Sequence, residues 1–217
     1  MRIALVNPNT CRKTTGTMVG IAAAAAGRGT LVEGHTARFG APLITEPQAL
    51  DDAAKAVLAL LPALAGADAI IVSAFGDPGL DGLRAHLDRP VTGIAEAGMA
   101  EAGAFGRRFA VVTTTPELAP RIARAAERYG QDGFAGTWTT PADPVALAAD
   151  PVALASALSD AIEQAIEKAD VSAVVIGGGP LAVAARSIAE TSRVPLIEPI
   201  SAAVRLTMSR LGVECPA

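Results

Sequence analysis

The stretches RIALVNPNT (residues 2–10) and RFAVVTTTP (residues 108–116) share one pattern, and this pattern decides the fold. Each begins with an arginine, continues through a short apolar run typical of a buried strand, and ends in a turn of small polar residues. The two stretches lie 106 residues apart, counted from residue 2 to residue 108. Self-similarity at a fixed spacing is the signature of a repeated unit, so the chain is predicted to contain two copies of one fold.

Three further pairs of apolar stretches follow in the same order in the two halves. Each third stretch runs into glycine and proline, and each fourth contains a proline followed by a glutamate. Any α/β chain with strands of Val, Ile and Ala looks self-similar to some degree, but the shared turn chemistry favours duplication. The pairs are TLVEGHTAR (30–38) with GFAGTWT (133–139), DAIIVSA (68–74) with VSAVVIG (171–177), and RPVTGIAE (89–96) with RVPLIEP (193–199).

Alanine-rich or amphipathic stretches separate these strands. Helical spacing is plainest in residues 144–169, where apolar residues recur from Ala153 to Ile166. Strands that alternate with helices imply right-handed crossovers and parallel sheets. The predicted fold class is therefore α/β, with two pseudo-symmetric parallel-sheet lobes: residues 1–97 plus about 205–217, and residues 98–204. The other expected helices are 19–26, 46–65, 78–88, 96–106, 117–129, 181–192 and 200–211.

Polar and glycine-rich turns follow the first and third strands of each half. They are Asn7–Thr10 and Thr113–Pro116 after the first strands, and Ser73–Asp77 and Gly177–Pro180 after the third. Because the carboxyl ends of parallel strands meet at one edge of a sheet, these turns are expected to face each other across an interlobe cleft. Their hydroxyls, amides and backbone N–H groups suit a small carboxylate or an imide oxygen. The candidate binding residues are Asn9, Ser73, Ala74, Phe75, Gly76, Thr114, Thr115, Gly178 and Gly179.

Each turn also has a simpler interpretation, because Asn, Thr and Gly are common in turns and helix caps. Asp77 is expected to cap the helix that follows it, with ligand contact as the alternative. Glu96 and Glu198 follow the fourth strands and are expected to tie loops together rather than act as acids. The four turns contain no lysine or arginine, and the run GGGP lacks the spacing of a phosphate-binding loop, so a nucleotide is not expected.

The composition excludes several classes of function. The chain has 217 residues, 51% hydrophobic and 18% charged, and a formal net charge of -4 with no basic stripe for a nucleic acid. No uninterrupted apolar run reaches about 18 residues, so no membrane span is expected. The cysteines, Cys11 and Cys215, provide neither a disulfide framework nor a metal-ligand cluster. We expect a cytoplasmic protein without a metal.

Four stretches carry a resemblance to a known family. They are MRIALVNPNT (1–10), SAFGDPGL (73–80), PVTGIAEA (90–97) and FAVVTTTP (109–116), and the resemblance extends to about residue 206. Together they resemble the hydantoin and allantoin racemases of the Asp/Glu/hydantoin racemase superfamily. The resemblance implies two pseudo-symmetric α/β lobes with the active site between them, in agreement with the repeat. It also implies cofactor-independent racemisation by two cysteines, one removing the α-proton and the other returning a proton from the opposite face.

This chain departs from that pattern at both cysteine positions. The resemblance places a cysteine at the end of each third strand, where this sequence has Ala74 and Gly178. Neither residue can carry a proton. The remaining candidates for a catalytic group are Asp77, if it turns inward, and Cys11, which lies where a helix dipole lowers a thiol pKa.

Several functions fit these observations. One is a cofactor-independent isomerase, or a related lyase or hydrolase, that binds a small carboxylate or cyclic ureide between the lobes and works without the two-thiol mechanism. An alternative is a catalytically inactive binding or regulatory protein that kept the ligand cradle, and another is a racemase that uses Cys11. The expected partner is a small molecule, and a homo-oligomer is compatible with the sequence.

Overall fold

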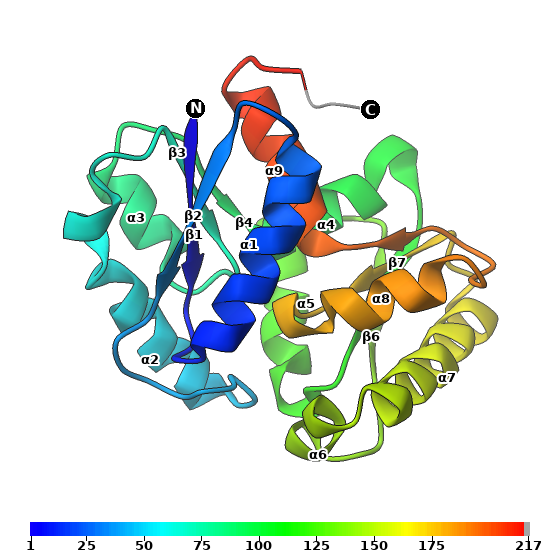
Figure 1. Ribbon diagram of the computed structural model, residues 1–217. Helices are drawn as coiled ribbons and strands as arrows, with labels where there is room; N and C mark the ends of the chain where they lie inside the picture. The colour runs from blue at the N-terminus through cyan, green and yellow to red at the C-terminus, as the bar shows by residue number, and fades with distance from the viewer. Residues whose placement is uncertain (215–217) are drawn as a thin grey trace.

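The computed structural model describes residues 1–214 and contains two α/β lobes, as predicted (Figure 1). Cys215 lies outside the described residues. The first lobe contains β1 (Arg2–Asn7), α1 (Arg12–Ala26), β2 (Leu31–Thr36), α2 (Pro47–Leu58), β3 (Ala69–Val72), α3 (Leu80–His86), β4 (Val91–Gly93) and α4 (Ile94–Ala102). The second contains β5 (Phe109–Thr113), α5 (Ala119–Arg128), β6 (Phe134–Thr139), α6 (Pro144–Ala149), α7 (Pro151–Ala169), β7 (Ala173–Ile176), α8 (Ala182–Ala189) and β8 (Leu196–Ile197), and α9 (Pro199–Arg210) follows. Short 3-10 turns, η1 (Leu61–Leu64), η2 (Ala104–Gly106), η3 (Pro116–Leu118) and η4 (Gly179–Leu181), complete the elements.

The two sheets repeat one topology. Each has four strands, in the order β2-β1-β3-β4 in the first lobe and β6-β5-β7-β8 in the second. Every strand pairing is parallel. The predicted α/β fold with two similar parallel sheets is therefore confirmed.

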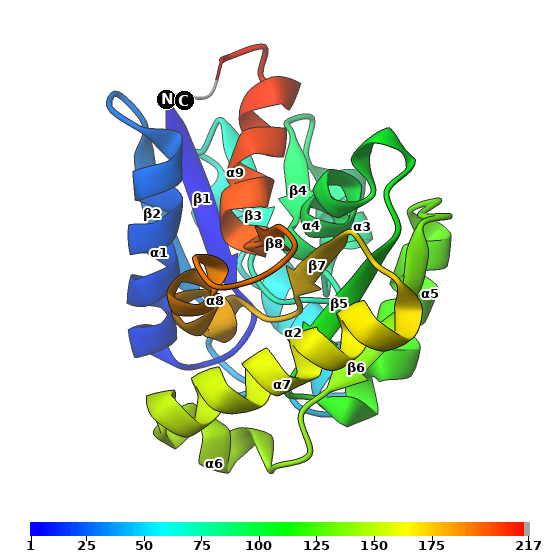
Figure 2. The ribbon, with the colours of Figure 1, turned by 90° about the vertical axis from the view of Figure 1, so that its right-hand side faces the viewer.

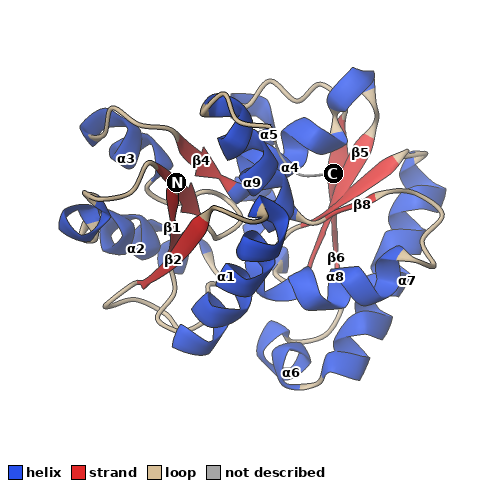
Figure 3. Ribbon diagram, turned by 45° about the horizontal axis from the view of Figure 1, so that its top comes forward, coloured by secondary structure: helices blue, strands red, loops and turns tan. Residues whose placement is uncertain are grey.

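Side chains alternate across each sheet, so both faces are covered by helices. Ile3 and Leu5 of β1 face the centre of the molecule, whereas Ala4 and Val6 pack in a separate cluster on the outer face. Helices α1, α4 and α9 lie between the two sheets (Figure 3). Helix α7 covers the outer face of the second sheet (Figure 2).

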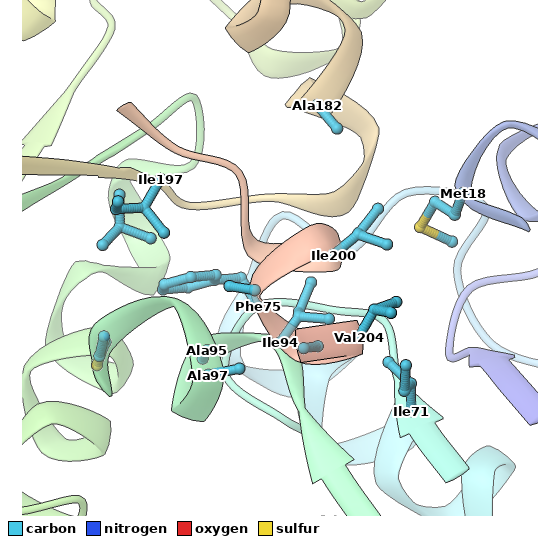
Figure 4. Packing of buried hydrophobic residues seen from close by; sticks show 14 of the residues in the cluster. Met18, Ile71, Phe75, Ile94, Ala95, Ala97, Ala182, Ile197, Ile200 and Val204 are labelled. Carbon is cyan, nitrogen blue, oxygen red and sulfur yellow. The ribbon is translucent and has the colours of Figure 1, made fainter. Parts of the chain in front are cut away.

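One continuous hydrophobic core joins the lobes. Figure 4 shows side chains of both lobes, among them Phe75 and Ile197, gathered around the first turns of α9. Met18 of α1 belongs to the same core and is fully buried. Because this core spans both sheets, the carboxyl ends of their strands are held at a fixed separation.

Helix α9 returns to the first lobe after the last strand. The Thr207 hydroxyl donates a hydrogen bond to the Thr92 hydroxyl of β4 at 2.9 Å, and Arg210 forms an ion pair with Glu96 at 2.7 Å. The predicted lobe boundaries at residues 97 and 205 fall inside α4 and α9, which are continuous helices, and the division of the chain into domains stays a prediction.

One predicted helix divides in two. Residues 144–169 form α6 and α7, because Asp150 interrupts the helix and caps the second part with hydrogen bonds from Val152 N–H and Ala153 N–H, both 3.0 Å. Proline follows Asp150 at the first position of α7, where its missing N–H costs nothing. Within the described residues, no helix combines the length and apolar character needed to cross a membrane.

Candidate functional site

A cavity of about 140 Å³ lies between the two lobes, where the carboxyl ends of the strands face each other. A volume of this size suits a molecule of one small ring, since a similar engineered cavity holds benzene. The turns after β1, β3, β5 and β7 all contribute to its wall. The lining residues are Asn9, Leu43, Ile44, Ser73, Ala74, Phe75, Thr113, Thr114, Thr115, Leu118, Pro144, Ala148, Leu154, Gly177, Gly178, Gly179, Pro180 and Leu181.

The structure brings the candidate binding residues together at this cavity, with one exception. Gly76 does not line it, whereas the other eight candidates named from the sequence do. Ala74 and Gly178, where the resemblance expects cysteines, both belong to the wall. Chemistry at this place would therefore have to use groups other than those two side chains.

The Asn9 side chain presents a donor to the cavity. Its Oδ1 atom accepts hydrogen bonds from Asn7 Nδ2 at 2.8 Å and from the Cys11 backbone N–H at 2.9 Å. A backbone N–H can only donate, so this contact fixes which end of the Asn9 amide is the oxygen. The Asn9 Nδ2 group has no partner within residues 1–214 and lies on a residue of the cavity wall.

Asn7 is the residue that holds this turn. It is fully buried, and its side chain bonds Asn9, the Cys11 carbonyl at 3.2 Å and the Thr15 hydroxyl at 2.9 Å. The sequence indicates Asn7 as a turn residue but cannot show that it joins β1 to α1. Asn7 thus holds Asn9 in place and is not itself one of the residues that line the cavity.

Backbone N–H groups supply further donors. Those of Ala74, Phe75, Thr114 and Gly179 make no hydrogen bond with any part of the chain that the structure describes, and all four residues line the cavity. The Thr114 hydroxyl likewise has no partner there. Unpaired donors from both lobes thus surround one small space, an arrangement that suits ligand oxygens.

In each lobe a side-chain hydrogen bond joins the ends of the two strands that carry these turns. In the first lobe, Ser73 Oγ at the end of β3 donates to the Val6 carbonyl of β1 at 2.8 Å. In the second lobe, Thr113 Oγ1 of β5 donates to the Gly177 carbonyl after β7 at 2.9 Å. Both bonds join the first strand of a lobe to its third, so each pair of turns forms one rigid wall.

Gly179 packs directly against the first lobe. A Cβ atom on this residue would lie 2.6 Å from Met18 Sδ and 2.9 Å from the Ser73 carbonyl oxygen, both in the first lobe. At Gly178 a Cβ would meet only the Leu181 side chain, at 3.1 Å. The glycine at position 179 is therefore required by the lobe contact, whereas position 178 has room to adjust.

Apolar residues from loops and outer helices cover the cavity. They are Leu43 and Ile44 in the first lobe, and Pro144, Ala148 and Leu154 in α6 and α7. Their place in the cavity wall was not predicted from the sequence, because they do not follow strand ends. Their apolar character was the only available signal, and in residues 144–169 it is equally expected of a helix packed on a sheet.

Asp77 does not line the cavity, and hydrogen bonds hold its side chain elsewhere. Its carboxylate accepts hydrogen bonds from Ala95 N–H at 2.9 Å, Glu96 N–H at 2.8 Å and the Tyr129 hydroxyl at 2.6 Å. The prediction that it caps the following helix is wrong, since Gly79 precedes α3 and Asp77 instead caps α4. Burial raises the pKa of Asp77 to about 6, against the lowering effect of its three donors.

Cys11 also lies apart from the wall. It precedes α1 and is half-buried, and hydrogen bonds from the side chain and backbone of Thr14 lower the pKa of its thiol. Cys11 is not among the residues that line the cavity. Glu96 and Glu198 tie elements together as expected: Glu96 pairs with Arg210, and Glu198 caps α9.

Within residues 1–214, the side chains that line the cavity include no ionisable group. Its polar members are asparagine, serine and threonine, and the rest are apolar residues and glycines. Among residues 1–214, no group of three or more His, Cys, Asp or Glu is placed to hold a metal ion. The site thus offers neutral hydrogen-bond donors in a confined apolar space.

Known proteins share this architecture. The family model described as Asp/Glu/Hydantoin racemase matches residues 3–207. A hydantoin racemase from Paenarthrobacter aurescens is 26% identical over 220 residues, which cover 98% of this chain and 92% of that protein. Two allantoin racemase structures, from Klebsiella pneumoniae and Pseudomonas fluorescens, are each 31% identical with a TM-score of 0.91. They match 100% of this chain and 90% and 94% of their own. With a family model that spans nearly its whole length, this chain belongs to the Asp/Glu/hydantoin racemase family.

Proposed function

We propose that this chain binds a small cyclic ureide of the hydantoin class in the interlobe cavity, without the two-thiol proton chemistry that the resemblance implies. The observation that carries the proposal is the composition of the cavity wall. Neutral donors from both lobes that are unpaired within residues 1–214 line it, and none of the described lining residues has an ionisable side chain.

The donors favour a neutral ligand with carbonyl oxygens. Asn9 Nδ2, the Thr114 hydroxyl and the unpaired backbone N–H groups can each donate to such an oxygen. A dicarboxylate such as malonate would bring two negative charges into a space that no lysine or arginine among residues 1–214 lines, which is costly unless each charge is paired. A small monocarboxylate is the other ligand class that these donors could serve. The similarity to hydantoin and allantoin racemases supports the ureide.

The same wall argues for binding rather than proton abstraction. A general base must lie within about 3 Å of the proton that it removes, or act through one water. Asp77 already accepts three hydrogen bonds and is not part of the wall. A binding or regulatory role is therefore the function that this geometry supports best.

A racemase that uses Cys11 is the second candidate. The lowered pKa of its thiol favours it, because the thiolate is the reactive form. Its backbone N–H bonds Asn9, which lines the cavity, so the thiol is one short turn from the site. That reaction would require the first turn of α1 to move the thiol inward.

Calorimetric titration of hydantoin, allantoin, acetate, malonate and aspartate would test the proposal. We expect saturable binding of a ureide and none of malonate or aspartate. The Asn9→Asp variant keeps the oxygen that holds the turn but replaces the donor by a negative charge, so the Kd for the ureide should rise at least about tenfold. Tighter binding of a carboxylate than of any ureide, or an unchanged Kd in Asn9→Asp, would contradict the proposal.

A further inference from the structure

We propose that Asp77 and Tyr129 are positioning residues for the ligand: the hydrogen bond between them holds the turn whose N–H groups line the cavity. The turn, residues 74–77, belongs to the first lobe, and Tyr129 belongs to the second. The inference rests on the proposed ligand binding at this cavity. It gives a role to a buried carboxylate that lies outside the cavity wall.

The backbone conformation of this turn requires contacts that stabilise it. Gly76 and Asp77 have φ angles of 100° and 52°, two consecutive residues in the left-handed region. A non-glycine residue keeps such a conformation only where its surroundings fix it. One backbone hydrogen bond, from Asp77 N–H to the Ala74 carbonyl at 3.1 Å, closes the turn. Ala74 and Phe75, which expose unpaired N–H groups, directly precede the strained pair.

The Asp77 carboxylate supplies those contacts. Only 3% of the residue is exposed, and its oxygens accept two N–H groups at the start of α4 and the Tyr129 hydroxyl. The carboxylate packs so closely on Gly93 that a Cβ there would lie 2.1 Å from its carbon. The turn is thus bound to α4 within its own lobe and to Tyr129 in the other.

The surroundings of Tyr129 favour donation of its hydroxyl proton to Asp77. The Arg128 guanidinium lies 4.7 Å from the centre of the tyrosine ring and donates to its hydroxyl oxygen at 2.5 Å, which leaves the hydroxyl proton for Asp77. Burial and the neighbouring Asp77 raise the pKa of Tyr129, so it stays protonated. Tyr129 directly follows α5, the helix that begins after the cavity residue Leu118. One bond therefore links the cavity turn of the first lobe to a helix that starts at the cavity in the second.

Burial and the hydrogen-bond donors around Asp77 set the pH above which this bond is charge-assisted. Burial raises the pKa of Asp77 to about 6, while the Tyr129 hydroxyl and the α4 N–H groups lower it. Above this pH the carboxylate is ionised and accepts a charge-assisted bond, and below it that assistance is lost. The charged groups nearby are Glu96 with its partners Arg84 and Arg210, and Arg128 with its partner Asp81.

Two matched variants, one within α5 and one at the residue that follows it, test the proposal. Tyr129→Phe removes only the hydroxyl, whereas Arg121→Gln breaks another interlobe contact, the exposed ion pair with Asp51 at 2.7 Å. We expect Tyr129→Phe to raise the calorimetric Kd for hydantoin about 3- to 10-fold, and Arg121→Gln to leave it unchanged. Equal effects of the two variants would overturn the proposal, because they would indicate general loosening between the lobes.

The pH profile of binding separates positioning from a merely structural role. Wild-type affinity should increase as the pH rises through about 6, because Asp77 ionises there. Tyr129→Phe removes a donor that lowers the pKa of Asp77, so the midpoint of its profile should move to higher pH. An unchanged midpoint would contradict the assignment.

Hydrogen exchange in the ligand-free protein tests whether the hydrogen bond between Tyr129 and Asp77 holds the turn, whether or not the protein binds a ureide. The amides of Asp77 and Ala95 should exchange faster in Tyr129→Phe than in wild type or in Arg121→Gln. If wild-type protein binds no ureide, the proposed function is wrong, and faster exchange still supports the fastening of the turn. Unchanged exchange would overturn it whatever the binding result.

Discussion

Replacing Gly179 by alanine tests the contact between this glycine and the first lobe. The added Cβ would lie 2.6 Å from Met18 Sδ and 2.9 Å from the Ser73 carbonyl oxygen, distances at which something must shift. Met18 is fully buried in the shared core, and the Ser73 carbonyl belongs to the backbone at the end of β3. The two lobes would therefore have to separate slightly at this contact. Such a separation would loosen the core that they share.

Overpacking of this kind costs about 1–3 kcal/mol of the free energy of unfolding. With a urea m-value of about 2 kcal/mol/M, the unfolding midpoint should fall by about 0.5–1.5 M. Gly178→Ala is the matched control, since its Cβ would meet a single side chain, that of Leu181 at 3.1 Å, and no backbone atom within 4 Å. Both changes restrict the unfolded chain alike, so their difference reports the contact. Urea unfolding followed by circular dichroism measures it, and a Gly179→Ala protein as stable as Gly178→Ala would refute the reasoning.

Two further predictions concern the buried carboxylate of Asp77 and the positions of Ala74 and Gly178. Burial penalises the ionised carboxylate of Asp77 by more than its hydrogen bonds offset, which is why its pKa is raised to about 6 from 3.8. The free energy of unfolding should therefore be highest below about pH 3.8 and fall by about 3 kcal/mol in total as the pH rises through about 6, although the bond to Tyr129 itself is stronger in the ionised state. Urea unfolding between pH 4 and 7 should show this loss in wild type and not in Asp77→Asn, and identical profiles would contradict it. Ala74→Cys combined with Gly178→Cys should restore solvent-deuterium exchange at C5 of a 5-substituted hydantoin, measured by NMR, and each single variant should exchange more slowly. A double variant that binds the ligand without any gain in exchange would show that the two positions do not flank the substrate carbon.

The repeat made most of the fold predictable from the sequence. The apolar runs after Arg2 and Arg108 are buried strands, and parallel pairing follows from the helices between them. Helix ends were harder to place. The break between α6 and α7 depends on the Asp150 cap, which competes with a strong helical pattern on both sides.

The site was predictable only as far as strand ends determine it. Turns after parallel strands must meet at a sheet edge, which is why eight of the nine candidate binding residues line one cavity. The apolar cover was not predictable, because the path of the loop carrying Leu43 and Ile44 depends on tertiary packing. Nor could the sequence show that Asp77 bonds Tyr129, since the two residues are 52 positions apart and belong to different lobes.

The central claim, ligand binding without α-proton abstraction, is tested most directly by deuterium exchange on a bound ligand. A 5-substituted hydantoin that calorimetry shows to be bound would be incubated with the wild-type protein in D₂O, and loss of its C5 proton followed by NMR. We predict saturable binding and exchange no faster than in buffer, because the described part of the chain places no ionisable side chain in the cavity wall. Exchange that wild-type protein accelerates by the roughly 10²–10⁴-fold typical of a general base would contradict the claim. Its loss in Cys11→Ser would then identify Cys11 as the base.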